Sequence, residues 1–303
     1  MYDIIIIGAG PAGLTAALYA LRADKSVLVL EKENFGGQIT FSPKIENYPS
    51  LKQISGSEFA EKLLDQVLDH GASVELAEAK EIRPVNEGYE VVTDTGNYIS
   101  KTVIIAAGSK HRHLGLPNEE NLIGEGVSYC AVCDGAFYAD KTVAVIGGGN
   151  TALQEAVMLS DYCKHVYVVQ NLGRFTGESK LITKLEHKGN VSFFFNTVVC
   201  DLIGDTKLEK LKLLDTSNEQ YSDLIVDGIF VAIGQIPEND IFSNVARIND
   251  AGYIISDETC LTGTRGIFVA GDCRTKSIRQ ITTAVADGAV AAVSACRYID
   301  GNL

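Results

Sequence analysis

The sequence predicts an α/β protein built from two similar units, each a parallel sheet covered by helices, with one unit inserted in the other. Three observations predict this class. An apolar, strand-like run at the start of the chain leads through a glycine-rich turn into a helical stretch, and the same pattern returns near the middle. The last part of the chain again reads as a buried strand followed by a long helix of small residues. Strands that alternate with helices in this way are typical of parallel sheets.

The first strand–turn–helix pattern has the spacing of a dinucleotide-binding turn. The run 2–7 is apolar, and Gly8, Gly10 and Gly13 follow it in G-x-G-x-x-G order. In such a turn the first glycine allows the tight bend, the second lets a pyrophosphate approach the backbone, and the third lets helix and strand pack closely. The next strand ends at Glu31, which is 31 − 10 = 21 residues past the central glycine. An acid at that distance can accept hydrogen bonds from a ribose.

The second pattern repeats the first. A strand-like run at 141–146 leads into Gly147, Gly149 and Ala152, in G-x-G-x-x-A order, and then into a helix. The next strand reaches Gln170, which is 170 − 149 = 21 residues past the central glycine. We therefore predict two Rossmann-like dinucleotide-binding domains of the three-layer ββα type. Two such domains in one chain suggest a flavin and a nicotinamide that exchange a hydride.

The residue expected to contact the ribose of the second nucleotide is unusual. Gln170 is neutral where the first unit has Glu31, and it is followed by Asn171 and Leu172. A site for NADPH usually needs cationic side chains to hold the 2′-phosphate, whereas a site for NADH usually carries an acid. Only Arg174 lies nearby. The second unit is thus predicted to have the fold of a nucleotide site without either standard reading residue.

The remaining strands complete the two sheets. The stretches 102–109 and 227–237 both read as strands that close on glycine. The segment 73–99 contains short strands with hairpin-like turns, which we expect to form a small antiparallel layer. Asp272 comes just past the end of a buried strand, where ligands bind in parallel sheets.

These elements give the expected domain boundaries. We expect a discontinuous first domain formed by residues 1–112 and 248–303, which binds FAD. The inserted second domain, residues 116–244, is of the pyridine-nucleotide type and carries the C-x-x-C sequence. The crossings near 112–116 and 244–248 are short, which leaves room for a hinge.

Composition limits the possible partners and the compartment. The 26 basic and 39 acidic residues give a net charge of −13, which argues against nucleic acid or an anionic membrane as a partner. No segment approaches ~20 uninterrupted apolar residues, so no membrane span is expected. The chain enters a strand at once, without a charged leader, and its seven cysteines are an odd number. Both features favour a reducing cytoplasm.

Cys130 and Cys133 are three residues apart, and Asp134 follows the second directly. A zinc site needs about four ligands, but this is the single C-x-x-C of the chain. Core packing is the default interpretation for the isolated cysteines, which are Cys163, Cys200, Cys260, Cys273 and Cys296. For the pair itself a redox dithiol is the better interpretation, with Asp134 as a general acid or base for the thiols.

The whole chain resembles the low-molecular-weight, bacterial-type thioredoxin reductases. The matching stretches are "IIGAGPAGLTAALYALRA", "GGQI", "IENYPS", "AAGSKHRHLGLPNEE", "GVSYCAVCDGAF", "GGGNTALQEA", "VAIGQIPE" and "AGDCRTKSIRQITTAVADGAVAA". The C-x-x-C-D ahead of the second glycine turn is particular to this family. The resemblance implies FAD bound by Gly8, Gly10, Gly13, Glu31, Gly37, Gln38, Asn47, Asp272, Arg279, Gln280 and Ile281.

The resemblance also implies how the pair works. Cys133 would face the flavin, Cys130 would exchange with the disulfide of thioredoxin or a similar redoxin, and Asp134 would handle protons. It implies a homodimer, and a domain rotation that presents the dithiol and the nicotinamide to the flavin in turn. The implied pyridine-nucleotide site comprises Gly147, Gly149, Asn150, Thr151, Ala152, Gln170 and Arg174.

One departure from the family leaves the electron donor open. The family's NADPH sequence after the second nucleotide strand is H-R-R-x-x-x-R, whereas this chain reads Q-N-L-G-R-F-T at 170–176. The donor is then NADH, or NADPH held through Arg174. Three alternatives use the same residues: a reductase fed by a reduced ferredoxin, a flavoprotein dithiol oxidase, and a redox sensor that is not an enzyme. The intact second glycine turn argues against ferredoxin.

Overall fold

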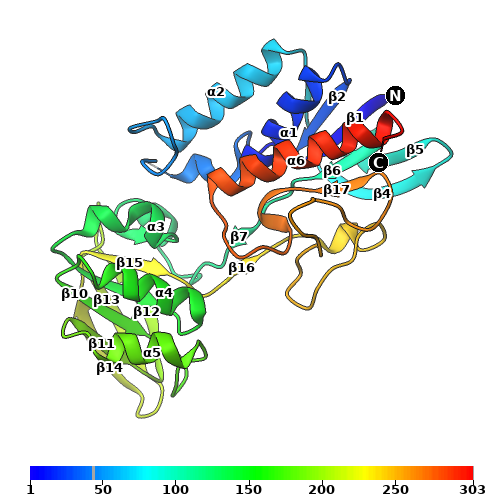
Figure 1. The fold of residues 1–303 in the computed structure, drawn as a ribbon. Coiled ribbons are helices and arrows are strands. Elements are labelled where there is room, and N and C mark those ends of the chain that lie inside the picture. Colours follow the sequence, from blue (N-terminus) through cyan, green and yellow to red (C-terminus); the bar gives the residue numbers. More distant parts are fainter. Residues whose placement is uncertain (43–44, 303) are drawn as a thin grey trace. The chain divides into compact units, whose positions relative to one another are not determined.

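The structure of this protein is a computed structural model that describes residues 1–42 and 45–302. Its chain forms two compact units (Figure 1). Unit 1 comprises Met1–Lys110 and Ile236–Leu303, and unit 2 comprises His111–Gln235. One unit is therefore inserted in the other, as the sequence predicts.

The chain passes between the units in two short strands that pair with each other. These strands are β7 (Lys110–His111) and β16 (Gln235–Ile236). The first crossing lies beside the expected position, but the second comes before the expected 244–248. The reason is packing, because Phe242 and its neighbours are buried in the core of unit 1 rather than in unit 2.

Unit 1 is built around a seven-stranded sheet. Its strands are β1 (Tyr2–Ile7), β2 (Val27–Glu31), β3 (Ser73–Leu76), β4 (Ala79–Val85), β5 (Gly88–Thr93), β6 (Asn97–Ile105) and β17 (Ile267–Val269). Its helices are α1 (Pro11–Arg22), α2 (Gly56–Asp69) and α6 (Ile281–Ile299), with the short 3₁₀ helices η1 (Gly37–Phe41), η4 (Asp240–Phe242) and η5 (Gly271–Cys273).

The order of this sheet is β3-β2-β1-β6-β5-β4, and β17 also pairs with β6. Strands β3, β2, β1, β6 and β17 run parallel, whereas β4 and β5 form an antiparallel branch. The expectation that all of 73–99 is antiparallel is wrong for β3. This strand extends the parallel sheet beside β2, with Leu28 opposite Ser73. It is the edge strand of the parallel sheet, and Ser73 and Val74 are half-buried while Glu75 and Leu76 are exposed.

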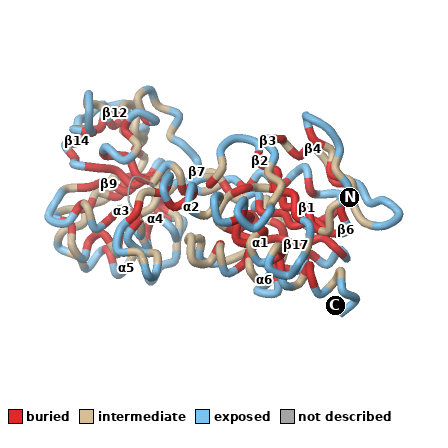
Figure 2. The backbone as a smooth tube through the Cα atoms, turned by 90° about the horizontal axis from the view of Figure 1, so that it is seen from above, coloured by how far each residue is buried: buried red, intermediate tan, exposed pale blue. Residues whose placement is uncertain are grey.

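Successive side chains of β1 enter two different cores, because a strand points alternate residues to opposite faces. Ile4 and Ile6 pack with the helices, and Ile5 and Ile7 pack with the residues on the other face. The helices lie close together, since a Cβ on Gly288 of α6 would come within 2.2 Å of the Ala12 carbonyl oxygen. Figure 2 shows the buried residues along the strands and inner helix faces of each unit.

Unit 2 repeats this design with a five-stranded parallel sheet in the order β11-β10-β9-β15-β8. Its strands are β8 (Val127–Ser128), β9 (Thr142–Ile146), β10 (His165–Val169), β11 (Val191–Phe194) and β15 (Gly228–Val231). A separate antiparallel sheet contains β12 (Thr197–Ile203), β13 (Lys210–Asp215) and β14 (Gln220–Ile225). The helices are α3 (Ala131–Asp134), α4 (Asn150–Leu159) and α5 (Ser179–Glu186), with η2 (Glu120–Leu122) and η3 (Gly135–Tyr138).

The two faces of this parallel sheet are covered differently. Val143 and Val145 of β9 pack with the helix side, and Ala144 and Ile146 pack with the antiparallel layer. Both units are thus three-layer arrangements of antiparallel strands, parallel sheet and helices, and the predicted α/β class is confirmed. Across the described ranges, no helix is both long and apolar enough to cross a membrane.

Candidate active site

The first glycine turn joins β1 to α1 with the geometry that its spacing predicts. Gly8 has a φ of +106°, and a Cβ there would lie 2.3 Å from the Ala106 carbonyl oxygen. A Cβ on Gly13 would lie 1.9 Å from the Gly8 carbonyl oxygen. Gly10 differs, because the nearest described atom to a Cβ there is the Gly36 oxygen at 3.9 Å. The backbone at Gly10 is therefore open to a ligand, whereas the space beside Gly8 and Gly13 is filled by other backbone atoms.

Glu31 holds this turn from the end of β2. Its Oε2 accepts a hydrogen bond from the Ala9 N–H at 2.8 Å, and its Oε1 accepts one from the Glu33 N–H at 2.9 Å. The side chain is buried, so the carboxylate is held by backbone donors in a fixed place. Each carboxylate oxygen has a further lone pair, which a ribose hydroxyl can use.

Further predicted residues gather around this turn. Gly37 lies next to Gly10, since a Cβ added to Gly37 would lie 3.5 Å from the Gly10 Cα. Gln38 follows it, exposed, in η1. Asn47 Nδ2 donates to Gln280 Oε1 at 3.1 Å, which ties the segment after η1 to the start of α6.

Asp272 and Arg279 lie between β17 and α6. Arg279 Nε donates to the Asp272 carbonyl oxygen at 3.3 Å, and its guanidinium lies over the Tyr253 ring at 4.1 Å. Asp272 is different, because its buried Oδ1 has no hydrogen-bond partner among the described residues. Burial raises the pKa of this carboxyl, with Lys276 and Arg279 opposing the shift. A buried acceptor without a donor destabilises a protein unless a ligand supplies the missing hydrogen bond.

These features fit a dinucleotide. The open backbone over Gly10, the ordered Glu31 carboxylate and the unpartnered Asp272 oxygen are three separate places where such a ligand could bond. All three lie in unit 1, at the carboxyl ends of parallel strands, which is where ligands bind in sheets of this kind. Gln280 caps α6 through a capping box with Thr283, and Ile281 begins that helix.

The second glycine turn repeats the backbone of the first. Gly147 has a φ of +133°, and a Cβ there would lie 2.4 Å from the Ala232 carbonyl oxygen. The nearest described atom to a Cβ on Gly149 is the Thr176 Oγ1, at 3.9 Å. Ala152 is fully buried where the first unit has Gly13. Asn150 and Thr151 begin α4 directly after this turn.

The loop 170–178 folds back onto that turn. Gln170 is buried, and a Cβ on Gly148 would come within 2.4 Å of its Nε2. Its Nε2 donates to the Arg174 carbonyl oxygen at 3.2 Å, and its Oε1 accepts from the Asn171 N–H at 3.1 Å. Gln170 therefore orders the loop itself, whereas Arg174 is exposed.

The end of the loop, just before α5, carries an acid. Glu178 Oε1 accepts from Asn150 Nδ2 at 3.3 Å, and the Glu178 N–H donates to Asn150 Oδ1 at 2.7 Å. These contacts place a carboxylate next to the first residue of α4, where an anionic phosphate would bind.

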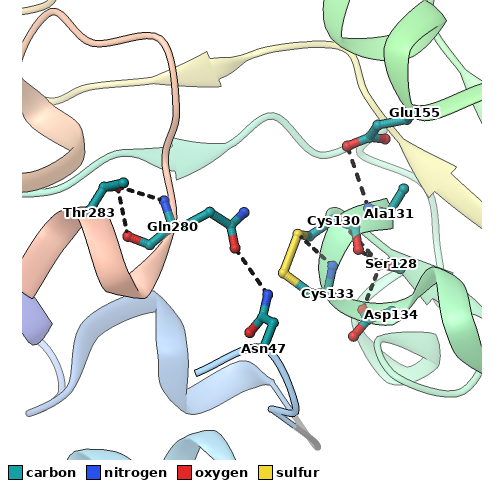
Figure 3. Close-up of a disulfide and its surroundings, with 9 residues drawn as sticks. All are labelled: Asn47, Ser128, Cys130, Ala131, Cys133, Asp134, Glu155, Gln280 and Thr283. Carbon is teal, nitrogen blue, oxygen red and sulfur yellow. Dashed lines mark hydrogen bonds between the residues drawn. A yellow bond between two sulfur atoms is a disulfide. The ribbon is translucent and has the colours of Figure 1, made fainter. Parts of the chain in front are cut away.

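The cysteine pair lies on the short helix α3 and forms a disulfide between Cys130 and Cys133 (Figure 3), with the two Cα atoms 5.3 Å apart. Cys130 is the N-cap of α3, and its Sγ accepts a hydrogen bond from the Cys133 N–H at 3.2 Å. Both cysteines are half-buried, and Val132 between them is 54% exposed. The pair is thus accessible from outside while one sulfur receives a backbone donor.

Asp134 is connected to this pair through a residue that the sequence analysis missed. Ser128 Oγ donates to Asp134 Oδ2 at 2.7 Å and accepts from the Cys130 N–H at 3.1 Å. Burial raises the pKa of Asp134, with the Ser128 hydrogen bond opposing the shift. A carboxyl whose pKa is raised above its ordinary value is better able to exchange protons with thiols.

Two more contacts around the pair were also missed. Tyr129, directly before Cys130, donates its hydroxyl to Glu119 Oε1 at 2.7 Å, and buried Glu119 also accepts the Leu114 N–H at 2.8 Å. Glu155 of α4 accepts from the Ala131 N–H at 3.5 Å. Nothing in the sequence could pair these residues, since each contact joins elements separated along the chain.

The other five cysteines have no partner sulfur among the described residues. Cys273 is fully buried, and burial raises the pKa of its thiol to about 12. Its sulfur contacts the Ala270 carbonyl oxygen at 3.3 Å, as a core thiol does. Within residues 1–42 and 45–302, no three His, Cys, Asp or Glu side chains gather as metal ligands would.

The fold and both glycine turns are those of a dinucleotide-dependent oxidoreductase with a disulfide. A family model described as "Pyridine nucleotide-disulphide oxidoreductase" matches residues 2–288. Over 301 residues the chain is 40% identical to a thioredoxin reductase of Listeria monocytogenes, covering 99% of this chain and 94% of that relative. It is 38% identical over 301 residues to a thioredoxin reductase of Bacillus subtilis, covering 99% of this chain and 95% of the relative.

A solved structure is similar to this chain along its whole length. The crystal structure of thioredoxin reductase from Streptococcus pyogenes is 38% identical, covers 99% of both chains and superposes with a TM-score of 0.95. The chain belongs to the pyridine nucleotide-disulphide oxidoreductase family and, within it, to the low-molecular-weight thioredoxin reductases. The family resemblance and the two Rossmann-like domains predicted from sequence are therefore confirmed.

Proposed function

We propose that this protein is an FAD-dependent thioredoxin-disulfide reductase, which passes electrons from a pyridine nucleotide through Cys130 and Cys133 to a thioredoxin-like disulfide. The observation that carries the proposal is the disulfide on α3, held beside a buried carboxyl in a chain with two dinucleotide turns. The similar proteins of Listeria monocytogenes and Bacillus subtilis are named thioredoxin reductases, which agrees with this function.

In this proposal FAD binds in unit 1. Gly8, Gly10, Gly13 and Gly37 shape the backbone cradle, Glu31 accepts from a ribose, and Asp272 gains the hydrogen bond that its Oδ1 lacks. The other proposed FAD residues are Gln38, Asn47, Arg279, Gln280 and Ile281. When bound, FAD accepts a hydride and delivers two electrons to the disulfide.

The residues of unit 2 carry the thiol chemistry. We assign Cys133 as the sulfur that receives the electrons and Cys130 as the sulfur that exchanges with the partner's disulfide. The Cys133 N–H donates to Cys130 Sγ and so favours a thiolate there. Asp134, aligned by Ser128, exchanges the proton of the departing thiol. A redoxin with an exposed disulfide is the proposed partner, and a cytoplasmic homodimer is the proposed form of the enzyme.

The nicotinamide nucleotide is proposed to bind at Gly147, Gly149, Asn150, Thr151 and Ala152, next to Gln170 and Arg174. The loop 170–176 carries one cation, Arg174, and Gln170 is occupied by contacts within that loop. We therefore expect NADH to serve at least as well as NADPH, because the 2′-phosphate finds only one guanidinium.

Glu178 favours a second candidate, in which the same reductase chemistry uses a non-nicotinamide donor such as a reduced ferredoxin. The carboxylate beside Asn150 repels a pyrophosphate at the start of α4. The open Gly149 backbone favours the nucleotide instead.

An anaerobic titration of the purified yellow protein separates these donors. Flavin bleaching is followed at its long-wavelength absorption band during addition of NADH, NADPH or a reduced ferredoxin. Bleaching by a nucleotide supports the first proposal. Bleaching by ferredoxin and dithionite, with neither nucleotide effective, supports the second.

Single substitutions test the dithiol. We expect Cys130→Ser and Cys133→Ser each to reduce thioredoxin turnover to background, because a disulfide needs both sulfurs. The flavin stays bound and reducible by dithionite, since both cysteines lie outside unit 1. Cys200→Ser, at a half-buried cysteine of the same unit, is the matched control and keeps its turnover. Thioredoxin turnover by either single mutant of the pair would contradict the assignment.

A further inference from the structure

Glu155 is an acid of the dithiol site that the proposed mechanism does not yet use. It lies in the middle of α4, and Figure 3 shows its side chain directed towards the start of α3. Glu155 Oε1 accepts from the Ala131 N–H at 3.5 Å. That N–H belongs to the peptide bond directly after Cys130, so the carboxyl contacts the backbone of one of the two cysteines.

This contact is too weak to explain why an acid is buried here. Hydrogen bonds from N–H to oxygen are usually 2.7–3.2 Å long, whereas this one is 3.5 Å. Glu155 Oε2 is buried and has no partner among the described residues. Burial raises the pKa of Glu155 to about 7, and the Ala131 N–H opposes the shift only in part. A glutamate kept only for structure would be expected to satisfy both oxygens.

The groups around Glu155 define what its charge can respond to. Cys130 lies next to the contacted peptide, and Asp134 is bonded to the same segment through Ser128. Tyr162, after α4, is the third titratable neighbour. Its pKa is raised to about 12 mainly by burial, with Glu155 adding to the shift. Among these described neighbours there is no cation to hold Glu155 in its charged form.

Opening the disulfide changes the charge next to Glu155. The Cys133 N–H donates to Cys130 Sγ, so Cys130 is the sulfur that carries a thiolate most easily. A thiolate at half-buried Cys130 and a carboxylate that contacts the next peptide repel each other, and the carboxyl then binds a proton more tightly.

We propose that Glu155 takes up a proton when the Cys130–Cys133 disulfide is reduced and releases it when the disulfide forms again. The inference rests on the proposed function, whose reductant supplies two electrons. These electrons break the S–S bond, Cys133 binds one proton and becomes a thiol, and Cys130 becomes a thiolate. Glu155 binds a second proton from solvent and becomes neutral. Oxidation of the dithiol by the partner's disulfide reverses each step, so the site gains one negative charge on reduction and offsets it at Glu155.

The test measures the dithiol–disulfide equilibrium of the holoenzyme without thioredoxin or nucleotide. The protein is equilibrated anaerobically in dithiothreitol redox buffers from about pH 5.5 to about pH 8.5, which bracket the ordinary carboxyl and thiol pKa values. Alkylation then traps the thiols, and peptide mass gives the fraction of reduced Cys130–Cys133. The variants are wild type, Glu155→Gln and, as a matched control, Glu186→Gln, which removes the same charge at an exposed position of α5.

The expected result has a definite sign. Below about pH 6, Glu155 is neutral in both redox states, so Glu155→Gln and wild type have similar equilibria. As the pH rises through about 7, Glu155 of the wild type must bind an extra proton when the disulfide is reduced. Glu155→Gln does not, so its disulfide becomes easier to reduce than that of the wild type. The ratio of the two equilibrium constants grows by up to about tenfold per pH unit until Glu155 is ionised in both states. Glu186→Gln follows wild type throughout.

Three results would overturn the inference, two in the redox equilibrium and one in infrared spectra. Identical curves for Glu155→Gln and wild type, or a ratio that is the same at every pH, would reduce Glu155 to a structural role. If wild-type Cys130 and Cys133 could not be cycled by dithiothreitol at all, the proposed function itself would fail. Infrared difference spectra of wild type give a second readout that needs no variant, since a protonated-carboxyl band must grow on reduction at about pH 8, above the ordinary carboxyl pKa. Its absence also contradicts the inference.

Discussion

The two glycine turns of this protein have nearly the same backbone but different side chains around it. Gly8 and Gly147 both adopt a positive φ under a neighbouring carbonyl oxygen, and Gly10 and Gly149 both leave the backbone open. The residue 21 positions past the central glycine differs. Glu31 bonds back to its turn, whereas the Gln170 side chain bonds within its own loop. The backbone of the two turns is thus set by the fold. The side chains that we expect to select the nucleotide, Glu31 and Gln170, come at the end of the strand after each turn.

The helices after the turns have diverged in the same way. Ala16 of α1 and Glu155 of α4 occupy equivalent positions, since 16 − 10 = 6 and 155 − 149 = 6. Ala16 is fully buried in an apolar core, whereas Glu155 contacts the peptide after Cys130. Unit 2 therefore carries an acid where unit 1 carries a core alanine. In unit 2 the peptide after Cys130 contacts this position, whereas in unit 1 helix α6 packs there, with a Cβ on Gly288 coming within 3.1 Å of the Ala16 nitrogen.

The largest expected change in unfolding free energy concerns the third residue of each turn motif, which is Gly13 in unit 1 and Ala152 in unit 2. Gly13→Ala would push a Cβ to 1.9 Å from the Gly8 carbonyl oxygen, where backbone meets backbone and neither side can yield easily. We expect a loss of about 3 kcal/mol or more of unfolding free energy, at the upper end of overpacking effects. Urea unfolding measures the loss, and the flavin-to-protein absorbance ratio shows whether the cofactor is released with it.

Ala152→Gly is the control for that substitution, because it gives the second turn the glycine of the first. We expect a loss of only about 1 kcal/mol, the cost of glycine inside a helix. Equal losses in the two variants would show that the turns are packed alike, contrary to the structure.

A smaller effect is expected at Glu31. Glutamine can still accept one of the two N–H groups that Glu31 now binds, but its amide group faces the other donor. We expect Glu31→Gln to lower the unfolding free energy by about 1.5–3 kcal/mol, the worth of a hydrogen bond to a charged group. It should also lower flavin retention after desalting. Exposed Glu33→Gln is the control in the same segment, and equal behaviour of the two would contradict a special role for Glu31.

The smallest structural change concerns the loop 170–176. Asn171 and Leu172 are exposed, so arginines there should leave the fold unaltered. In the double variant Asn171→Arg/Leu172→Arg we expect the NADPH concentration for half-bleaching of the flavin to fall at least about tenfold, since each charge-assisted bond contributes about 1.5–3 kcal/mol. The NADH value should stay unchanged. Asn218→Arg adds one positive charge, half as many, in the turn between β13 and β14. An effect there of half the size or more would mean that only net charge matters.

Much of this molecule could be predicted from local sequence. The glycine spacings locate both turns, and the strand lengths place Glu31 and Gln170 at matching sheet edges, because each depends on a few consecutive residues. The cysteine pair was also recognisable, since three-residue spacing permits a disulfide across one turn.

What could not be predicted depends on contacts between distant segments. Ser128 reads as an ordinary strand residue, and its bond to Asp134 exists only because α3 turns back on β8. Glu155 reads as a polar position in an amphipathic helix until α3 covers it. The sequence predicts the second crossing at 244–248, later than in the structure, because Phe242 and Val245 are apolar residues that could be buried in either core. Tertiary packing alone assigns them to unit 1.

The insertion of unit 2 within unit 1 sets an order of events during synthesis of the chain. All of unit 2 has been made by residue 235, whereas β17, η5 and α6 of unit 1 follow it in the chain. Domains fold as units while the chain emerges. We therefore expect the cysteine-bearing unit to be folded on the ribosome while β6 still waits for β17. The proposed first nucleotide site, to which we assign Asp272 and Gln280, is completed only after η5 and the start of α6 have emerged.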